Sequence, residues 1–73
     1  MPDLTEGIEI IAGVSSGRPC VAGTGIIAEI ISGRFSAGES IHSIAEDYDL
    51  SDKQVEAAVR FTLSQLWKHE RTE

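Results

Sequence analysis

Residues 40–67 read SIHSIAEDYDLSDKQVEAAVRFTLSQLW, and this stretch decides the fold. Its first part spaces Ile41, Ile44 and Ala45 at i, i+3 and i+4, which predicts one apolar face of a short helix. After residue 51 the same period continues for about three turns and predicts a second, longer helix. The apolar positions of that helix are Val55, Ala58, Val59, Thr62, Leu63, Leu66 and Trp67.

The junction between the two helices carries turn and capping signals. Leu50 is the apolar residue that a short helix–helix turn places in the core. Ser51 and Gln54 have the spacing of a capping box, in which each side chain hydrogen-bonds the other residue's backbone amide. Asp52 adds a negative charge near the positive end of the helix dipole. A short helix, a tight turn and a sharply capped longer helix together predict a helix-turn-helix.

The residues before this helix pair predict a third helix and two short strands. Residues 26–35 group their apolar residues at i, i+1, i+4 and i+5, which favours a helix over a strand. Residues 36–39 connect this helix to Ser40, the expected N-cap of the next one. Residues 7–12 and 20–22 predict the strands of a hairpin. The expected apolar positions of the third helix are Ile26, Ile27, Ile30, Ile31 and Phe35.

We therefore expect a mainly α fold, with a three-helix helix-turn-helix core and a short N-terminal β-hairpin. Residues 8–67 form the single domain, residues 1–7 a flexible N-terminus and residues 68–73 a charged tail. Two strands this short are marginal alone in water, so the helices or a second copy of the chain must cover them. A domain of 73 residues buries only about 60% of its unfolded surface, and oligomerisation is a common remedy at that size.

The charge balance of the chain is acidic. Lys and Arg number 6 against 12 Asp and Glu, which gives a formal net charge of −6 at pH 7. This balance opposes non-specific contact with phosphate and suits a protein that covers a basic partner, although acidity also simply favours solubility. A single cysteine excludes an intramolecular disulfide and a metal site built on thiolates. The sequence shows neither a leader nor an apolar run of about 18 residues, so we expect a cytoplasmic protein with no membrane contact.

The residue types of catalysis and metal binding lie scattered along the chain. His42 and His69 are far apart in sequence, and no base that the pattern can place neighbours Cys20. The acidic residues at positions 46, 47 and 49 favour a solvated helix end over a metal site. The Gly-Thr-Gly of residues 23–25 favours a strand-to-helix turn over a phosphate-binding loop, because it lacks a third glycine and a downstream lysine. We therefore predict no enzyme activity, no catalytic residue, no metal and no cofactor.

The start of the last helix is the candidate DNA surface, because the second helix of a helix-turn-helix points its N-terminal residues at base edges. The candidate DNA-binding residues there are Asp52, Lys53, Gln54, Ala57 and Arg60. The two cations suit phosphate or guanine, and Gln54 suits adenine if the capping box does not use it. Asp52 and Glu56 repel phosphate on the same surface. The alternative is that this surface is only the outer face of a core helix, so we expect double-stranded DNA to bind weakly to the chain alone.

A partner surface is predicted from the last helix and the strands. Phe61 and Trp67 lie about 200° apart on a helical wheel at ~100° per residue, so one core cannot bury both on one face. Phe61 therefore predicts a second face that binds another chain, unless it packs on the N-terminal strands. We expect a homodimer. The candidate partner and dimer interface comprises Ile8, Ile10, Cys20, Val21 and Phe61.

Several segments, taken together, resemble a known family over roughly residues 8–65. They are residues 17–24 (GRPCVAGT), 37–41 (AGESI), 44–48 (IAEDY), Leu50 and 55–58 (VEAA). On these segments the chain resembles domain-of-unknown-function family 433. The resemblance implies a homeodomain-like three-helix core, dimerisation partly through the N-terminal strands and an antitoxin of the VapB kind. Such antitoxins bind a PIN-type ribonuclease toxin and often repress their own operon.

One residue departs from the family pattern, which has arginine after Gly-Thr where this chain has Gly25. Glycine cannot contact phosphate as the arginine fork would, and this lowers the expected DNA affinity. The leading hypothesis is a non-enzymatic, dimeric, antitoxin-like helix-turn-helix protein that binds a PIN-type toxin and operator DNA, with Arg18 contacting phosphate near the hairpin. The alternative is an acidic protein-interaction module that neutralises a basic partner without binding DNA.

Overall fold

The structure, a computed structural model, describes residues 6–70, with the backbone alone for residue 15 and residues 66–70. Within this range it is mainly helical, and a two-stranded antiparallel hairpin precedes three α-helices, as the sequence predicts. The elements in chain order are β1 Ile8–Glu9, the 3₁₀ turn η1 Ser15–Gly17, β2 Cys20–Val21, α1 Ala28–Ser36, α2 Ile41–Tyr48 and α3 Asp52–Glu70. The predicted flexible N-terminus and charged tail fall outside the described residues at positions 1–5 and 71–73.

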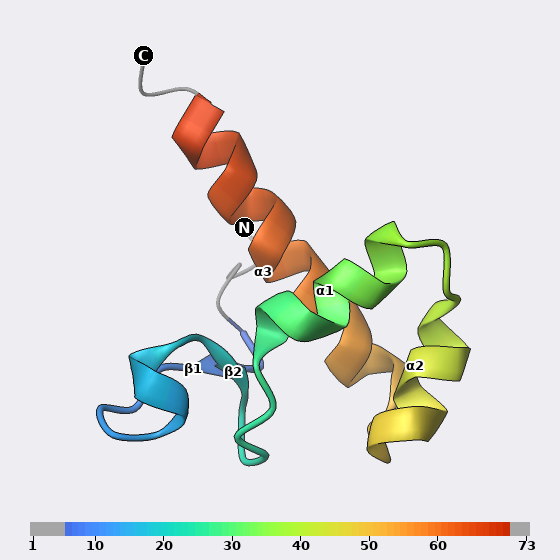
Figure 1. Cartoon of the computed structure of the whole chain (residues 1–73), viewed down its shortest axis with the longest axis horizontal. Helices are drawn as coiled ribbons and strands as arrows, with labels where there is room; N and C mark the ends of the chain where they lie inside the picture. Colours follow the sequence, from blue (N-terminus) through green and yellow to red (C-terminus); the bar gives the residue numbers. More distant parts are fainter. Residues whose placement is uncertain (1–5, 71–73) are drawn as a thin grey trace.

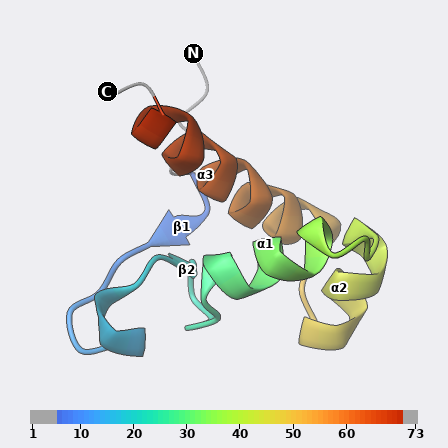
Figure 2. The same ribbon diagram turned by 45° about the horizontal axis from the view of Figure 1, so that its top comes forward.

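The long helix α3 runs across the molecule, and α1 crosses it (Figure 1). The hairpin lies beside the start of α1, and α2 lies beyond the end of α1, so the two flank the crossing from opposite sides (Figures 1 and 2). In Figure 2 the hairpin, α1 and α2 all lie below α3. One surface of α3 therefore meets the other helices, and another remains for external contacts.

The hairpin is shorter than predicted. Its register pairs Ile8 with Val21 and Glu9 with Cys20. The strand expected over residues 7–12 ends early because the chain curls into a turn, in which the Val14 amide donates to the Ile11 carbonyl at 3.0 Å. Local turns of this kind use the backbone groups that a longer strand ladder would need.

Helix α1 begins at Ala28 rather than at Ile26, because β2 holds the preceding residues extended. The Val21 amide donates to the Ile26 carbonyl at 2.8 Å, and Cys20 forms a bridge with Ile27. Ile27 consequently has φ −68° and ψ 125°, which is extended backbone. The predicted helix is confirmed, but tertiary contacts move its first turn.

The buried face of α1 consists of Ala28, Ile31 and Ser32. Ser32 Oγ lies 2.8 Å from Thr62 Oγ1 and 3.2 Å from the Ala58 carbonyl oxygen, so hydrogen bonds accompany its burial. These contacts fix which side of α1 meets α3. As a result Ile30 and Phe35, which the sequence places in the core, are 50% and 41% exposed, and that expectation is wrong.

The turn between α2 and α3 is built from backbone hydrogen bonds. Asp49 adopts the left-handed conformation with φ 58° and ψ 42°, and its amide donates to the Glu46 carbonyl at 3.3 Å. The Leu50 amide donates to the Ala45 carbonyl at 2.8 Å, which completes a Schellman motif and ends α2. Leu50 also packs against the core, as the sequence predicts.

Both predicted N-caps are present. Ser40 Oγ accepts from the Ser43 amide at 3.1 Å at the start of α2. At the start of α3, Ser51 Oγ accepts from the Gln54 amide at 3.1 Å, and Gln54 Oε1 accepts from the Ser51 amide at 2.8 Å. This reciprocal pair is the predicted capping box, and it determines where α3 begins.

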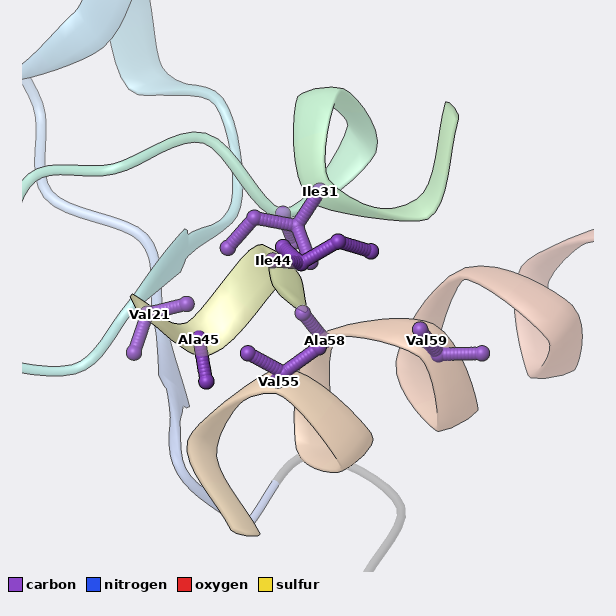
Figure 3. Close-up of a cluster of buried hydrophobic side chains, with 8 residues drawn as sticks. Val21, Ile31, Ile44, Ala45, Val55, Ala58 and Val59 are labelled. Carbon is purple, nitrogen blue, oxygen red and sulfur yellow. The ribbon is translucent and has the colours of Figure 1, made fainter. Parts of the chain in front are cut away.

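A hydrophobic core joins β2 to the helices, and Figure 3 shows side chains from these elements converging. Its buried members are Val21, Ala28, Ile31, Ile44, Ala45, Val55, Ala58 and Val59. The apolar faces predicted for α2 and for the first half of α3 are therefore confirmed. Leu63 is 59% exposed, so the predicted stripe leaves the core before this residue. The side chains of Leu66 and Trp67, also predicted in the stripe, lie outside the described residues.

Arg34 links α1 to α2 across their connection. Its Nε donates to Glu39 Oε2 at 2.9 Å, and its Nη2 also reaches the carboxylates of Glu39 and Asp47. Its guanidinium carbon lies 5.4 Å from the centre of the Tyr48 ring. The hydrogen bond from Arg34 lowers the pKa of the Glu39 carboxyl, and the bonds to Glu39 and Asp47 raise the pKa of Arg34. This cluster fixes the helix-turn-helix pair relative to α1.

Candidate functional site

The outer face of α3 presents two cations. Lys53, Ala57 and Arg60 follow at i, i+4 and i+7, so they share one face, turned away from the core residues Val55 and Ala58. Lys53 and Arg60 are exposed, and neither forms an ion pair within the part of the chain that the structure describes. They stand about 10 Å apart along the helix at ~1.5 Å per residue. This is the surface that the sequence predicts for DNA.

Gln54, predicted to contact adenine, takes part in the capping box. An amide side chain that recognises adenine uses both its oxygen and its nitrogen. The Gln54 oxygen already accepts from the Ser51 amide at 2.8 Å. Gln54 could recognise adenine only if the capping box left its side chain free, and in this structure the capping box uses that side chain.

Carboxylates crowd the same end of α3. Asp52 and Glu56 are both exposed beside the two cations. His42 of α2 lies between two acids, with Nδ1 3.4 Å from Asp52 Oδ1 and Nε2 3.4 Å from Glu46 Oε2. The negative charge around the start of α3 opposes the approach of phosphate, as the sequence predicts for Asp52 and Glu56.

The N-terminal segment lies over this face of α3. A groove of about 400 Å³ is lined by Glu6, Gly7, Lys53, Gln54, Glu56, Ala57 and Arg60. A Cβ placed on Gly7 would stand 3.2 Å from the Ala57 Cβ, so the backbone at Gly7 rests directly on the helix. The Gly7 carbonyl also accepts from the Ala22 amide at 2.8 Å. Gly7, which the sequence assigns to the flexible N-terminus, thus contacts both α3 and β2.

Arg18, the predicted phosphate contact of the hairpin, is exposed but does not line this groove. It stands before β2, where its carbonyl oxygen accepts from Cys20 Sγ at 3.2 Å. The structure therefore brings Lys53, Ala57 and Arg60 together on one face and leaves Arg18 on a separate surface.

Three residues predicted for the partner interface are buried inside the chain. Cys20 and Val21 are 2% and 1% exposed, so a second chain cannot contact their side chains while the hairpin is folded. Phe61 is 7% exposed and lines a small apolar pocket with Pro19 and Ile27. The alternative given for Phe61, that it packs toward the N-terminal strands, fits this placement, and the prediction of an exposed second face does not.

An exposed apolar loop follows β1, and the sequence pattern predicts only part of it. We call Ile10, Ile11 and Val14 the apolar hairpin loop; they are 62%, 44% and 39% exposed. Ile10 was predicted for the interface together with Ile8, which is half-buried against the core. The missed signal is that branched apolar residues continue past the end of the alternating strand pattern, where no strand partner can cover them.

The loop between β2 and α1 forms hydrogen bonds with residues of the hairpin. The Gly23 amide donates to Glu9 Oε2 at 2.9 Å, and Thr24 Oγ1 donates to the Val21 carbonyl at 2.8 Å. A carboxylate thus occupies the amide that a phosphate would need, which favours the strand-to-helix turn over the phosphate-binding loop.

Among the described side chains no cluster of three or more His, Cys, Asp and Glu could hold a metal ion. No helix in the described range has the length and apolarity needed to cross a membrane.

The comparison with protein families gives one finding. Residues 8–62 match the family described as "Protein of unknown function (DUF433)". Comparisons with curated proteins and with solved structures give no match. The matched range begins at β1 and reaches into α3, so it contains both the apolar hairpin loop and the cations of α3.

Proposed function

The chain belongs to the DUF433 family, and from this premise we propose that it is a non-enzymatic, antitoxin-like helix-turn-helix protein. It binds a toxin partner as a dimer in the cytoplasm, and operator DNA is a second, weaker ligand. The family description assigns no activity, so the support comes from the surfaces of the chain. The observation that carries the proposal is the apolar hairpin loop.

The apolar hairpin loop supports protein binding. Its three branched residues are 39–62% exposed and follow one another within a short stretch of chain. Apolar residues exposed together are typical of protein-interaction surfaces. The loop that follows β1, drawn in blue at the left of Figure 1, projects away from α2 and from α3. One chain can therefore hold a protein at the hairpin and DNA at α3 through different surfaces.

The charge of the chain favours a basic partner of ribonuclease type. A ribonuclease must hold RNA phosphates, which requires a cationic surface. The net charge of −6 complements such a surface and would cover it in competition with RNA. The acidic side chains near the turn between α2 and α3, which oppose DNA, add to this negative charge. A PIN-type ribonuclease toxin is the proposed partner.

The test is affinity capture by the tagged full chain from a nucleic-acid-depleted lysate of its source cells. We expect a stoichiometric, small, basic ribonuclease with the unchanged chain and its loss with the double variant Ile11→Ser/Val14→Ser. The matched control is Ile30→Ser, because Ile30 is 50% exposed on α1. Equal capture by all three proteins would exclude the loop as the contact, and capture without any ribonuclease would contradict the antitoxin proposal.

Dimerisation is proposed through the β1 side of the hairpin. Ile10 is exposed beside Ile8, and a domain of this size gains stability from association. Light scattering at micromolar concentration should give the mass of a dimer, and Ile10→Glu should shift it toward the monomer. A monomer mass for the unchanged chain would refute this part of the proposal.

The proposed DNA contact uses Lys53 and Arg60, with Arg18 reaching phosphate separately. Reversal of both α3 charges, Lys53→Glu/Arg60→Glu, should abolish duplex binding. Arg18→Ala should weaken duplex binding and reduce the slope of log affinity against log salt concentration by about one, the contribution of one phosphate contact. Unchanged affinity in the double variant would exclude the outer face of α3.

A second candidate function is an acidic protein-interaction module that does not bind DNA. The observation in its favour is that Gly7 covers Ala57 while the capping box engages Gln54. Partner binding with a steep salt dependence, combined with no duplex binding at low salt, would support this module over the operator-binding antitoxin. Partner binding that is insensitive to salt would count against it.

A further inference from the structure

The N-terminal segment occupies the face of α3 that a helix-turn-helix uses on DNA. Ala57 lies between Lys53 and Arg60 on that face, and the backbone of Gly7 rests on it. Gly7 has φ +83°, a conformation that favours glycine, and a side chain there would meet the Ala57 Cβ at 3.2 Å. The segment is therefore closely seated on the helix. We call Glu6 and Gly7 the N-terminal strap.

The dimensions of DNA do not admit α3 and the strap together. An α-helix with its side chains is about 10–12 Å across, and the major groove is about 12 Å wide, so a recognition helix fills the groove alone. A backbone segment packed beside another element adds roughly 5 Å, about the spacing of neighbouring strands. With the strap in place, the Ala57 face cannot reach base edges.

The strap also carries the wrong charge for a DNA complex. Glu6 lines the same groove as Lys53 and Arg60. A phosphate that approaches the two cations meets this carboxylate, which repels it. The strap thus competes with DNA in two ways, by the volume of its backbone at Gly7 and by the charge of Glu6.

We propose that the N-terminal strap is autoinhibitory, so that α3 contacts bases only when Glu6 and Gly7 leave the Ala57 face. This inference rests on the DNA contact proposed above and assigns control of that contact to the strap. While the strap is seated, Lys53 and Arg60 reach phosphates at most. Its release requires the Gly7 carbonyl to give up the Ala22 amide, which it now accepts at 2.8 Å.

A reversible lock tests the strap in the full chain. In Gly7→Cys/Ala57→Cys the two Cβ atoms start 3.2 Å apart, within a few tenths of an ångström of the usual disulfide separation of about 3.5–4.5 Å. The native thiol of Cys20 is only 2% exposed and stays out of the reaction. The substitution at position 7 is present in both the oxidised and the reduced form, so their comparison separates the lock from the substitution. The control is Ala57→Cys alone under the same redox conditions.

The probe is a labelled duplex of the DNA immediately upstream of the chain's own coding sequence. Reduction of the locked variant should tighten binding about tenfold or more, the equivalent of one or two good base contacts, and the control should not respond. Equal affinity of the two redox forms would overturn the strap while leaving DNA binding intact. No binding by either form, under conditions where lysate capture still recovers a ribonuclease, would overturn the strap and the DNA contact but not the toxin contact.

A second pair of proteins keeps the test decisive if the cysteine variant does not fold. A chain that begins at Ile8 lacks the strap, and full-length Asp3→Asn/Glu6→Gln has the same net charge with the backbone of the strap retained. We expect the shortened chain to bind the duplex more tightly than the charge-matched chain. Equal affinities would show that only charge matters and would overturn the steric strap.

Discussion

The capping box at the start of α3 is the feature on which the candidate DNA surface depends, and Ser51→Ala tests it. Ser51 Oγ accepts from the Gln54 amide at 3.1 Å. The substitution removes that acceptor and leaves one amide of the first turn without its partner. Ser51 is exposed, so no cavity accompanies the change and the loss of the cap is the whole effect.

The expected magnitude follows from the cap alone. Replacement of an N-cap serine by alanine costs about 1 kcal/mol, within a range of about 0.5–2 kcal/mol. For a domain of this size, 1 kcal/mol lowers Tm by about 4–8 °C. Thermal and urea unfolding followed by far-UV circular dichroism should show this loss with an unchanged urea m-value, because the buried surface stays the same.

Ser43→Ala is the matched control. Ser43 is an exposed serine within α2, and its side chain forms no hydrogen bond among the described residues. Alanine there should be neutral or stabilising by up to about 0.5 kcal/mol, because alanine is the better helix former. A Ser51→Ala protein that is no less stable than Ser43→Ala would refute the capping argument.

Three further substitutions test the packing and the electrostatics. Ile44→Ala removes a side chain that is 0% exposed and should lower the free energy of unfolding by about 2–5 kcal/mol. The urea unfolding curve of this variant should therefore begin with little or no folded protein. A loss below about 1 kcal/mol would contradict the placement of Ile44 in the core. Ser32→Ala breaks the buried contact with Thr62 and should cost about 1 kcal/mol in urea unfolding, whereas Ser36→Ala at the exposed end of α1 should not. The pKa of Glu39 is lowered in the folded chain by Arg34, so this contribution to stability is present above the ordinary pKa of the carboxyl and is lost as pH falls through the lower, folded pKa. Arg34→Met should therefore be less stable than the unchanged chain at neutral pH, and the gap should narrow in acid; a gap that is independent of pH would contradict the role of this ion pair.

Much of the helix-turn-helix could be predicted from the sequence because its determinants are local. The capping box joins Ser51 to Gln54, and the apolar face of α2 repeats within one helix. The two caps, the turn residue Leu50 and the buried positions of α2 were accordingly correct. Each of these features depends on side chains no more than a few residues apart, which a period or a short motif captures.

The errors arise where contacts distant in sequence decide the outcome. Helix α1 begins late because β2 holds Ile26 through a backbone hydrogen bond. Ser32 is buried in place of Ile30 because it meets Thr62 of α3, far along the chain. The periodicity of residues 26–35 does not reveal this exchange. Contact with α3 is what buries Ser32 and leaves Ile30 exposed.

The candidate site likewise has one part that could be predicted from the sequence and one part that could not. Lys53, Ala57 and Arg60 share one face because all three lie on one helix, and helical spacing is sufficient to predict this. The contact of Gly7 with Ala57 brings together residues from opposite ends of the domain, and the sequence pattern does not predict it. The chemistry of the surface was therefore predictable, but its accessibility was not.

The proposal that the chain neutralises a basic ribonuclease is tested most closely by an assay of RNA cleavage. Material captured on the tagged chain is released with high salt, returned to low salt and assayed on labelled RNA with increasing amounts of added chain. We expect the released protein to cleave RNA and one equivalent of the unchanged chain to suppress the cleavage, while Ile11→Ser/Val14→Ser does not. Released material that cleaves no RNA, or cleavage that continues at full rate with excess chain, would contradict it.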